Sequence, residues 1–562
     1  MTTRGIDSIM SRRRFLQGTG ALALAATSPL LENSAVHAEP GVTNGARQRL
    51  TMQEEETPVQ GGNLYFISRQ VPSSLDANVW TATAAAVIMR QLYDPLVWQP
   101  EGGQFVPGLA ESWEISADGL SYTFTLRQDV TFHDGTPLNA ESVKATYDRM
   151  IDPATKSLQI ARLGPYDRSE VVSEFVVRIY LTEPFAPLLS SMSEVALAPI
   201  SPAAVEALGD GFARTPVSTG PFKVKEWPDE TTLIFERNPD YAWAPEFFTN
   251  PGPAHLDTIT YRFIEEESTR MVSLETGEAD IVEQLPAMEI QTVQENEKFQ
   301  LSSSVLPGMP ELCSINVSNG PTQELAVRQA MLFGVDREAL ALVLFQGGFP
   351  AAHGPLTSAS WAYWEGVEDM YPFDPDKAAD LLDKAGWVMG GDGVREKEGQ
   401  KLTVRAVTSA GGETQRVAEF VQASLMELGF DYVVEAMAYE ATATRFAEND
   451  YEVGRFGLVS IDPHDSLFAA FHSSQIEGGS QFNRSRIDDS EMDELIERAA
   501  VEGDTEKRGE IYRELQQRIM EQALILPAFE RPTAYGLQPR VHGFADDLLG
   551  RPYLSNTWLG DD

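Results

Sequence analysis

The alternation of apolar and polar residues between positions 92 and 150 predicts a β-hairpin followed by a helix. Bulky apolar residues occupy every second position of 122–127, and this period places residues 122, 124 and 126 on one face of a half-buried strand. Asp-Gly pairs at 118–119 and 134–135 indicate turns at the two ends of this strand. Asn139 stands where a helix N-cap belongs, and apolar residues follow at helical spacing.

The rest of the chain mixes strand-like and helix-like patterns, which predicts an α/β fold. A strand, a helix and a second strand within 402–434 predict a right-handed βαβ unit. Asp374 is expected to cap a helix in which Pro375 takes the first position, where its missing N–H is harmless. Ser268 is expected to cap another short helix. Further strands are predicted at 62–67, 175–181, 259–263 and 524–526, and a further helix at 505–522.

The first 38 residues are predicted to be an export signal rather than part of the fold. The run from Ser11 to Gln17 resembles the twin-arginine export motif, and a mildly apolar stretch, 18–31, follows it. That stretch is too short to span a bilayer, which needs about 20 apolar residues. Small residues at 36–38 suit cleavage after Ala38, and the polar linker 39–58 is expected to be disordered.

The charge balance of the chain excludes one class of function. The 562 residues contain 43 Lys and Arg against 84 Asp and Glu, a formal net charge of −41. Nucleic-acid-binding surfaces are basic, so no nucleic-acid partner is expected. The acids form no long run, and we expect them to be spread over the surface, where they favour solubility.

The cysteine count and the motif content argue against a metal cluster, a cofactor or catalysis. Cys313 is the only cysteine, which rules out an intramolecular disulfide and favours a buried, small apolar role for its side chain. A lipid anchor is not expected, because the predicted cleavage site has no cysteine. The chain contains no nucleophile-elbow, zinc-protease, phosphate-loop or dinucleotide-binding motif. We therefore expect no enzyme activity and no cofactor.

One family resembles this chain closely in the segment that begins at Leu92. Tyr-Asp-Pro-Leu-Val, Leu-Ala-Glu-Ser-Trp, Tyr-Thr-Phe-Thr-Leu-Arg and Val-Thr-Phe-His-Asp-Gly-Thr-Pro follow one another there in fixed order. This order is similar to that of the large extracytoplasmic solute-binding proteins, family 5, of peptide, dipeptide and nickel ABC importers. The resemblance implies a two-lobed fold with an extra subdomain inserted in the first lobe and a hinge of two crossing strands.

The resemblance also implies the domain boundaries. The first lobe is expected to be discontinuous, with a second lobe that begins near the crossing at residues 314–316 and a final return to the first lobe. The expected segments are 59–97 and 217–312 for the first lobe, 98–216 for the inserted subdomain, 313–526 for the second lobe and 527–562 for the return.

The stretch 455–465 is the sharpest candidate for ligand binding. In the family this strand and loop lie at the cleft, and the strand can pair with an extended ligand. Peptide binders of the family often have Arg-x-Gly-Trp-x-x-Asp here, and Arg455 and Gly457 match that pattern, whereas Leu458 replaces the tryptophan. The aspartate that would hold a peptide ammonium is supplied only by Asp462, through a shifted loop. Arg455 is expected either to meet a ligand carboxylate or to pair with a surface acid.

Other residues are candidates for the ligand site by the same resemblance. Asp-Pro-His at 462–464 is similar to a motif of nickel and metallophore binders, so His464 with His472 could ligate a metal chelate, or both could be structural. Asn316 is expected either to bind ligand backbone or to hold the crossover. Trp80 and Trp361, with Tyr363 and Trp364, are candidate covers of the ligand, or packing residues.

The function that these features imply is ligand capture for import. The chain is expected to bind oligopeptides or dipeptides outside the cytoplasm by closure of its lobes, and to deliver them to ABC permease subunits served by cytoplasmic ATPase subunits. The alternative ligand is a metal chelate or another small organic solute. A periplasmic or extracellular, twin-arginine-exported monomer is expected.

Overall fold

The computed structural model describes residues 57–79, 83–477 and 482–561. The predicted export signal, the linker as far as residue 56, and Trp80 lie outside these ranges. Three larger hydrophobic cores hold the described chain together. One lies at the seven-stranded sheet, one lies in the inserted subdomain, and the third extends from the five-stranded sheet to residues of the seven-stranded sheet.

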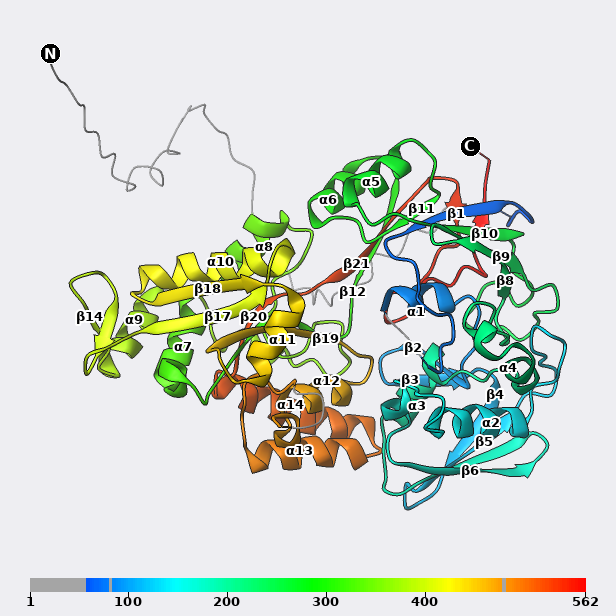
Figure 1. Cartoon of the computed structure of the whole chain (residues 1–562), viewed down its shortest axis with the longest axis horizontal. Coiled ribbons are helices and arrows are strands. Elements are labelled where there is room, and N and C mark those ends of the chain that lie inside the picture. Colours follow the sequence, from blue (N-terminus) through cyan, green and yellow to red (C-terminus); the bar gives the residue numbers. More distant parts are fainter. Residues whose placement is uncertain (1–56, 80–82, 478–481, 562) are drawn as a thin grey trace, which may run out of the picture. The chain divides into compact units, whose positions relative to one another are not determined.

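A seven-stranded sheet forms the first lobe (Figure 1). The predicted first strand is confirmed as β1, which lies inside the sheet and pairs in parallel with β10 and β11. In sheet order the strands are β12 (Gln300–Val305), β21 (Pro532–Leu537), β11 (Ile281–Glu283), β1 (Asn63–Ser68), β10 (Thr258–Phe263), β9 (Thr232–Arg237) and β8 (Phe222–Asp229). The first lobe also contains helices α1 (Thr83–Met89), α4 (Pro202–Leu208), α5 (Glu267–Glu275) and α6 (Ala287–Glu295).

The prediction that Ser268 caps α5 is wrong. The N-cap is Glu266, whose carboxylate accepts hydrogen bonds from the backbone N–H of Ser268 (3.1 Å) and Thr269 (2.6 Å). A longer side chain thus satisfies two of the free N–H groups at the start of the helix, and Ser268 falls in its first turn.

The inserted subdomain follows the predicted alternation. Strand β5 and its neighbour β7 both alternate between partly exposed and buried positions, and their apolar faces pack on helix α2. Asn139 caps α2, and its carboxamide accepts from the Ser142 N–H (3.0 Å) while the Ser142 hydroxyl accepts from the Asn139 N–H (3.1 Å). The elements are β4 (Ala110–Ile115), β5 (Ser121–Leu126), β7 (Val176–Leu181), β6 (Tyr166–Ser173), α2 (Ala140–Ile151) and α3 (Leu188–Met192).

A five-stranded sheet forms the second lobe, and it contains the predicted βαβ unit. Strands β17 and β18 pair in parallel and are joined by helix α10, as expected from the sequence. In order the strands are β18 (Asp431–Met437), β17 (Thr403–Ser409), β19 (Val453–Val459), β13 (Gly308–Ile315) and β20 (Ile525–Phe529). The helices are α7 (Leu325–Gly334), α8 (Arg337–Phe345), α9 (Pro375–Lys384), α10 (Gly412–Glu427), α11 (Tyr439–Ala447), α12 (Pro463–Phe471), α13 (Ser490–Val501) and α14 (Thr505–Glu521).

Two neighbouring segments carry the chain between the two sheets, and both crossings lie away from their predicted positions. Strand β13 already pairs with β19 from Gly308 onward, so the second lobe begins before residue 313. Strand β20 still pairs with β13 as far as Phe529, so the chain leaves the second lobe after residue 529 and not after residue 526. Because β12 pairs with β21 on the other side, the crossings run side by side, as Figure 1 shows.

Shorter elements complete the described chain. The remaining strands are β2 (Val97–Glu101), β3 (Gln104–Pro107), β14 (Val388–Met389), β15 (Arg395–Lys397), β16 (Gln400–Lys401), β22 (Val541–His542) and β23 (Trp558–Leu559). Short 3-10 helices occupy Ile160–Leu163, Val195–Leu197, Gly209–Ala213, Gly320–Gln323, Glu365–Val367 and Ser473–Gln475.

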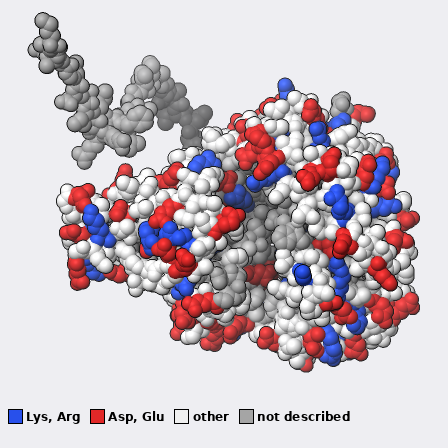
Figure 2. Space-filling view, in the orientation of Figure 1, with Lys and Arg blue, Asp and Glu red and all other residues white. Residues whose placement is uncertain are grey.

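The surface and the single cysteine agree with the sequence analysis. Figure 2 shows Asp and Glu side chains spread over the face it presents, with Lys and Arg between them. Cys313 is buried in β13, and burial raises the pKa of its thiol to about 12, so it stays protonated and inert. Among the described residues, no helix combines the length and the apolar character that crossing a membrane requires.

Candidate functional site

The segment that the sequence singles out runs from β19 into helix α12. Pro463 takes the first helical position, and Asp462 caps the helix by accepting from the His464 N–H (2.9 Å). The helix presents the side chains of residues 464, 465, 468 and 472 to one cavity, a spacing that keeps them on one face. The end of β19 contributes Leu458 and Val459 to the same cavity.

This cavity is the candidate ligand site, because both lobes line it. Its volume is about 1110 Å³, somewhat above the range of roughly 300–1,000 Å³ that is usual for small-molecule sites. In Figure 1, α12 and α13 of the second lobe face the subdomain elements around α3 and β6. The lining residues are Leu158, Gln159, Ala161, Arg162, Gly164, Pro165, Glu183, Pro184, Phe185, Glu194 and Leu549 from the first lobe, and Leu458, Val459, Ser460, His464, Asp465, Phe468, His472, Glu494, Glu497, Arg498, Ala500 and Val501 from the second.

Asp465 contributes a carboxylate without a partner to this cavity. It lies in the first turn of α12, and among the described residues its side chain has no hydrogen bond or ion pair. Burial raises its pKa to about 7, the nearby Asp462 carboxylate raises it further, and Arg162 opposes both. A cationic ligand group beside Asp465 would favour its charged form, so the site is suited to an ammonium.

The first-lobe wall opposite α12 contains a chain of ion pairs made of three guanidinium groups and two carboxylates. Glu194 is buried and forms ion pairs with Arg162 and with Arg551 (Nη1 to Oε2, 3.6 Å). Arg551 in turn contacts Asp547 (2.7 Å), which also binds Arg90 (2.8 Å). The Glu194 charge raises the pKa of Arg162, so this guanidinium is held on the wall as half of a pair. The alternating charges continue from the interior of the first lobe to the edge of the cavity.

His464 and His472 lie on the same face of α12, with the Phe468 ring between them. The ring centroids of His464 and Phe468 are 5.4 Å apart, those of Phe468 and His472 are 4.6 Å apart, and Phe185 meets His464 edge-on at 5.6 Å. His464 is only 9% exposed, and its Nδ1 has no hydrogen-bond partner among the described residues. Burial lowers its pKa to about 4, which keeps the imidazole neutral.

A metal ion would need ligands from the solute at this site. His472 is engaged with Ser474 Oγ (Nδ1, 2.8 Å) and Glu497 Oε1 (Nε2, 3.3 Å). Within the described residues, no group of three or more His, Cys, Asp or Glu side chains is arranged to hold a metal. The donor set therefore suits a chelate completed by imidazole rather than a bare ion.

Asp462, the predicted ammonium anchor, forms an ion pair within the protein. It is 2% exposed and accepts from Arg508 at both oxygens (2.8 and 3.0 Å). The pair is buried, and Tyr512 Oη lies 3.5 Å from the same carboxylate. The carboxylate of Asp462 is thus paired with Arg508 and at the same time caps α12.

Arg455 and Gly457 do not line this cavity. Arg455 Nη2 donates to both carboxylate oxygens of Glu311 (2.8 Å each), which realises the alternative of pairing with an acid. Gly457 allows this packing, because a Cβ there would lie 3.1 Å from the Pro310 carbonyl oxygen and 3.2 Å from the Glu311 carboxyl group. Arg455 instead borders a separate internal void of about 20 Å³, next to Cys313.

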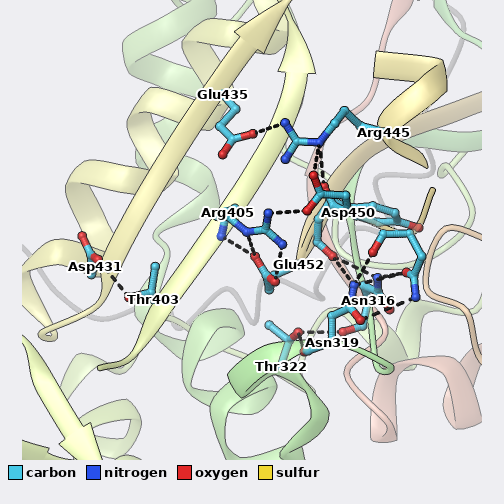
Figure 3. Close-up of polar contacts among 12 residues, drawn as sticks. Asn316, Asn319, Thr322, Thr403, Arg405, Asp431, Glu435, Arg445, Asp450 and Glu452 are labelled. Carbon is cyan, nitrogen blue, oxygen red and sulfur yellow. Dashed lines mark hydrogen bonds and ion pairs between the residues drawn. The ribbon is translucent and has the colours of Figure 1, made fainter. Parts of the chain in front are cut away.

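Asn316 holds the backbone of the second lobe together (Figure 3). It is fully buried, and its amide donates to Asn449 Oδ1 (2.7 Å) and to the Tyr451 carbonyl (3.0 Å), while its Oδ1 accepts from the Ser318 N–H (2.9 Å). Figure 3 shows it beside an ion-pair network that links Arg405 with Glu452 (2.8 Å). All of these partners belong to the second lobe, and Asn316 follows the end of β13 that is remote from the crossing.

Trp361 lies where the two lobes touch. Its ring packs on Tyr512 (5.7 Å) and under the Arg508 guanidinium (5.4 Å). On its other side is the β2–β3 turn of the first lobe, where a Cβ on Gly102 would lie 2.6 Å from the Trp361 Cβ. Trp361 therefore joins the Asp462–Arg508 pair to the opposite lobe, and it does not line the cavity.

The sequence analysis missed several lining residues. Asp465 directly follows Asp-Pro-His, and its helical spacing to residues 468 and 472 was a usable signal. Arg162, Phe185 and Glu194 carried no signal, because they are distant in sequence and meet α12 only through the folding of the subdomain.

The fold and the cavity define a solute-binding protein with two lobes. The model of the family described as "Bacterial extracellular solute-binding proteins, family 5 Middle" matches residues 104–478. The chain belongs to this family, which confirms the resemblance seen in the sequence. Proteins of this family are binding components of ABC importers rather than enzymes, and they deliver solutes to permease and ATPase subunits.

Individual relatives share moderate identity over most of their length. The glutathione-binding protein GsiB of Escherichia coli (strain K12) is 28% identical over 463 residues, which cover 81% of this chain and 86% of that protein. NikA from Brucella suis, in complex with Fe(III)-EDTA, is 25% identical with a TM-score of 0.78, covering 89% of this chain and all of that one. The oligopeptide-binding protein AppA from Bacillus subtilis, in complex with a nonapeptide, has the same fold (TM-score 0.71, 24% identity, 90% of this chain and 100% of that one).

The buried Asp462–Arg508 pair makes a testable contribution to stability. Replacing Arg508 with Ala leaves the Asp462 charge buried without a partner, and we expect the free energy of unfolding to fall by about 3–5 kcal/mol. Urea-induced unfolding followed by tryptophan fluorescence measures this loss.

The exposed pair Arg127–Asp129 provides the matched control. Arg127→Ala is expected to cost about 1 kcal/mol or less. The double variant Asp462→Ala/Arg508→Ala should lose less free energy of unfolding than the two single variants lose together. The reason is that neither charge is then left buried without its partner. An Arg508→Ala protein as stable as the Arg127→Ala control would show that the pair does not hold α12.

Proposed function

We propose that this protein captures oligopeptides or dipeptides outside the cytoplasm and delivers them to the permease of an ABC importer. The observation that carries this proposal is the cavity of about 1110 Å³ between the lobes, which contains the unpaired carboxylate of Asp465. A peptide offers an ammonium for that carboxylate and apolar side chains for Phe185, Phe468 and Val459. Ligand contacts to both lobes would favour the closed state.

The anchor in this proposal is Asp465 rather than Asp462. The charge of Asp462 is already neutralised by Arg508, whereas Asp465 lies one turn further along α12. Of the residues proposed from the sequence, His464 stays a proposed ligand contact, while Asp462, Trp361 and Asn316 are proposed to position the site. The relative named as glutathione-binding and the solved complex with a nonapeptide support a peptide-like ligand.

A metal chelate is the second candidate ligand. It is favoured by one specific observation, the neutral imidazole of His464, whose Nδ1 has no partner among the described residues. The likeness to NikA in complex with Fe(III)-EDTA supports the same alternative.

Native mass spectrometry of the protein purified from its host separates these two proposals. A heterogeneous set of co-purified short peptides is expected, because a cavity of mixed polarity accepts many side chains. A single bound metal complex, with no peptides, would replace the peptide proposal by the chelate proposal. Adding short peptides to stripped protein should raise its melting temperature, since a ligand that binds only the folded state stabilises it.

The pH dependence of peptide affinity tests Asp465 as the anchor. Its pKa of about 7 without ligand means that binding an ammonium must first remove a proton below that pH. We expect the affinity to fall by up to about tenfold per pH unit as the pH drops below 7, and to fall again above about pH 8, where the peptide ammonium loses its proton. Calorimetric titration with a free-amine tripeptide measures this profile.

Two variants complete the Asp465 test. Asp465→Asn should weaken binding at pH 8 and flatten the profile. Asp376 is the matched control, because it lies in the first turn of α9, is exposed and does not line the cavity; Asp376→Asn should leave both affinity and profile unchanged. An unaltered profile in Asp465→Asn would remove this residue from the anchor role.

Export by the twin-arginine route and a monomeric, periplasmic or extracellular state without a lipid anchor are further parts of the proposal. The export route rests on the run from Ser11 to Gln17. Replacing Arg12 and Arg13 together with Lys is expected to leave uncleaved protein in the cytoplasm, detected by cell fractionation and immunoblotting. The single replacement Arg4→Lys, outside the motif, should be exported normally. Normal export of the double variant would contradict the route.

A further inference from the structure

The charged groups around the cavity are unequal in number. Five carboxylates line it, against two guanidinium groups. The carboxylates are Glu183, Glu194, Asp465, Glu494 and Glu497, and the guanidinium groups are Arg162 and Arg498. His464 adds no positive charge near neutral pH, because burial keeps its pKa at about 4.

Pairing within the protein leaves this surplus in place. Arg162 is paired with Glu194, which Arg551 also contacts, so the first-lobe wall offers a ligand no unpaired guanidinium group. Glu497 contacts His472. Among the described lining residues, the carboxylates of Asp465, Glu183 and Glu494 have no ion pair. Arg498 is the one lining guanidinium group of the described chain that also has no ion pair, so unpaired carboxylates outnumber unpaired guanidinium groups.

The excess of carboxylates in the cavity lining acts on a ligand that is partly removed from bulk water, where charges interact more strongly. Field lines from like charges concentrate in a cleft between low-dielectric walls, and the net charge of −41 on the whole chain adds to the same potential. Burial raises the pKa of Asp465 to about 7, and the nearby Asp462 and Glu194 carboxylates raise it further. The buried His464 Nδ1 on the same wall has no hydrogen-bond partner within the described chain, so it can accept or donate a hydrogen bond to a ligand in the cavity.

We infer that the cavity selects peptides with a net positive charge, those with a Lys or Arg side chain, over neutral peptides, and selects against acidic ones. This inference rests on the proposed function and names the ligand class for the same site. The first-lobe wall cannot reverse the preference, because its one lining cation is already paired with Glu194. Apolar parts of the ligand meet Phe185, Phe468 and Leu458, which are indifferent to charge.

The test compares three peptides that differ in one side chain. Calorimetric titration at pH 8 with Ala-Lys-Ala, Ala-Gln-Ala and Ala-Glu-Ala, all with free termini, should give affinities in that order, with about tenfold between the first and the last. Adding 0.5 M NaCl should narrow the difference, because screening weakens interactions between accessible charges.

Two charge-removing variants locate the source of the preference. Glu494→Gln removes an exposed, unpaired acid of the cavity and should reduce the Lys-to-Glu ratio about threefold, the effect of one accessible charge pair. Glu230→Gln is the matched control, since this residue is exposed in the β8–β9 turn and does not line the cavity; it should leave the ratio unchanged.

The outcomes separate this inference from the proposed function. Equal affinities for the three peptides, or tighter binding of Ala-Glu-Ala, would overturn the charge preference and leave peptide capture intact. If Glu494→Gln and Glu230→Gln change the Lys-to-Glu affinity ratio equally, the acids of the cavity do not cause the charge preference. The inference that the cavity selects positively charged peptides would then be overturned. Absence of binding by all three peptides would overturn both proposals.

Discussion

The ion pair between Asp462 and Arg508 is the interaction on which the arrangement of the candidate site depends. Both side chains are almost completely buried, and the carboxylate also caps helix α12. An unpaired charge at that depth would be very costly, so the two groups must stay together. Because α12 starts at this pair, the direction in which its His464 and Asp465 side chains point is determined there.

The same pair also connects the site to the contact between the lobes. Arg508 lies over the Trp361 ring, and Trp361 touches the Gly102 turn of the first lobe. The crossing strands tether the two lobes on one side of the cavity, and this turn contacts the second lobe at another point. A rotation of the lobes must therefore change the environment of Trp361 and of the cavity together.

The two walls of the cavity differ in how their charges are satisfied. On the first lobe, Arg90, Asp547, Arg551, Glu194 and Arg162 alternate in sign, and each group has a partner. On the second lobe, Asp465 has none among the described residues. Charges that are paired within the protein can exclude water and provide shape, whereas an unpaired carboxylate can discriminate between ligands.

Sequence periodicity determined much of the architecture: the alternating strands β5 and β7, the capped helices α2 and α9, and the parallel βαβ unit around α10. These features depend on neighbours within a few residues, so local physics is enough to specify them. The crossings and the site depended on tertiary structure. Whether Asp462 or Asp465 faces the cavity is decided by Arg508, which is distant in sequence, and the opposite wall is brought there by the subdomain. The sequence identifies the residue types, but only packing decides which charge is neutralised and which is left for a ligand.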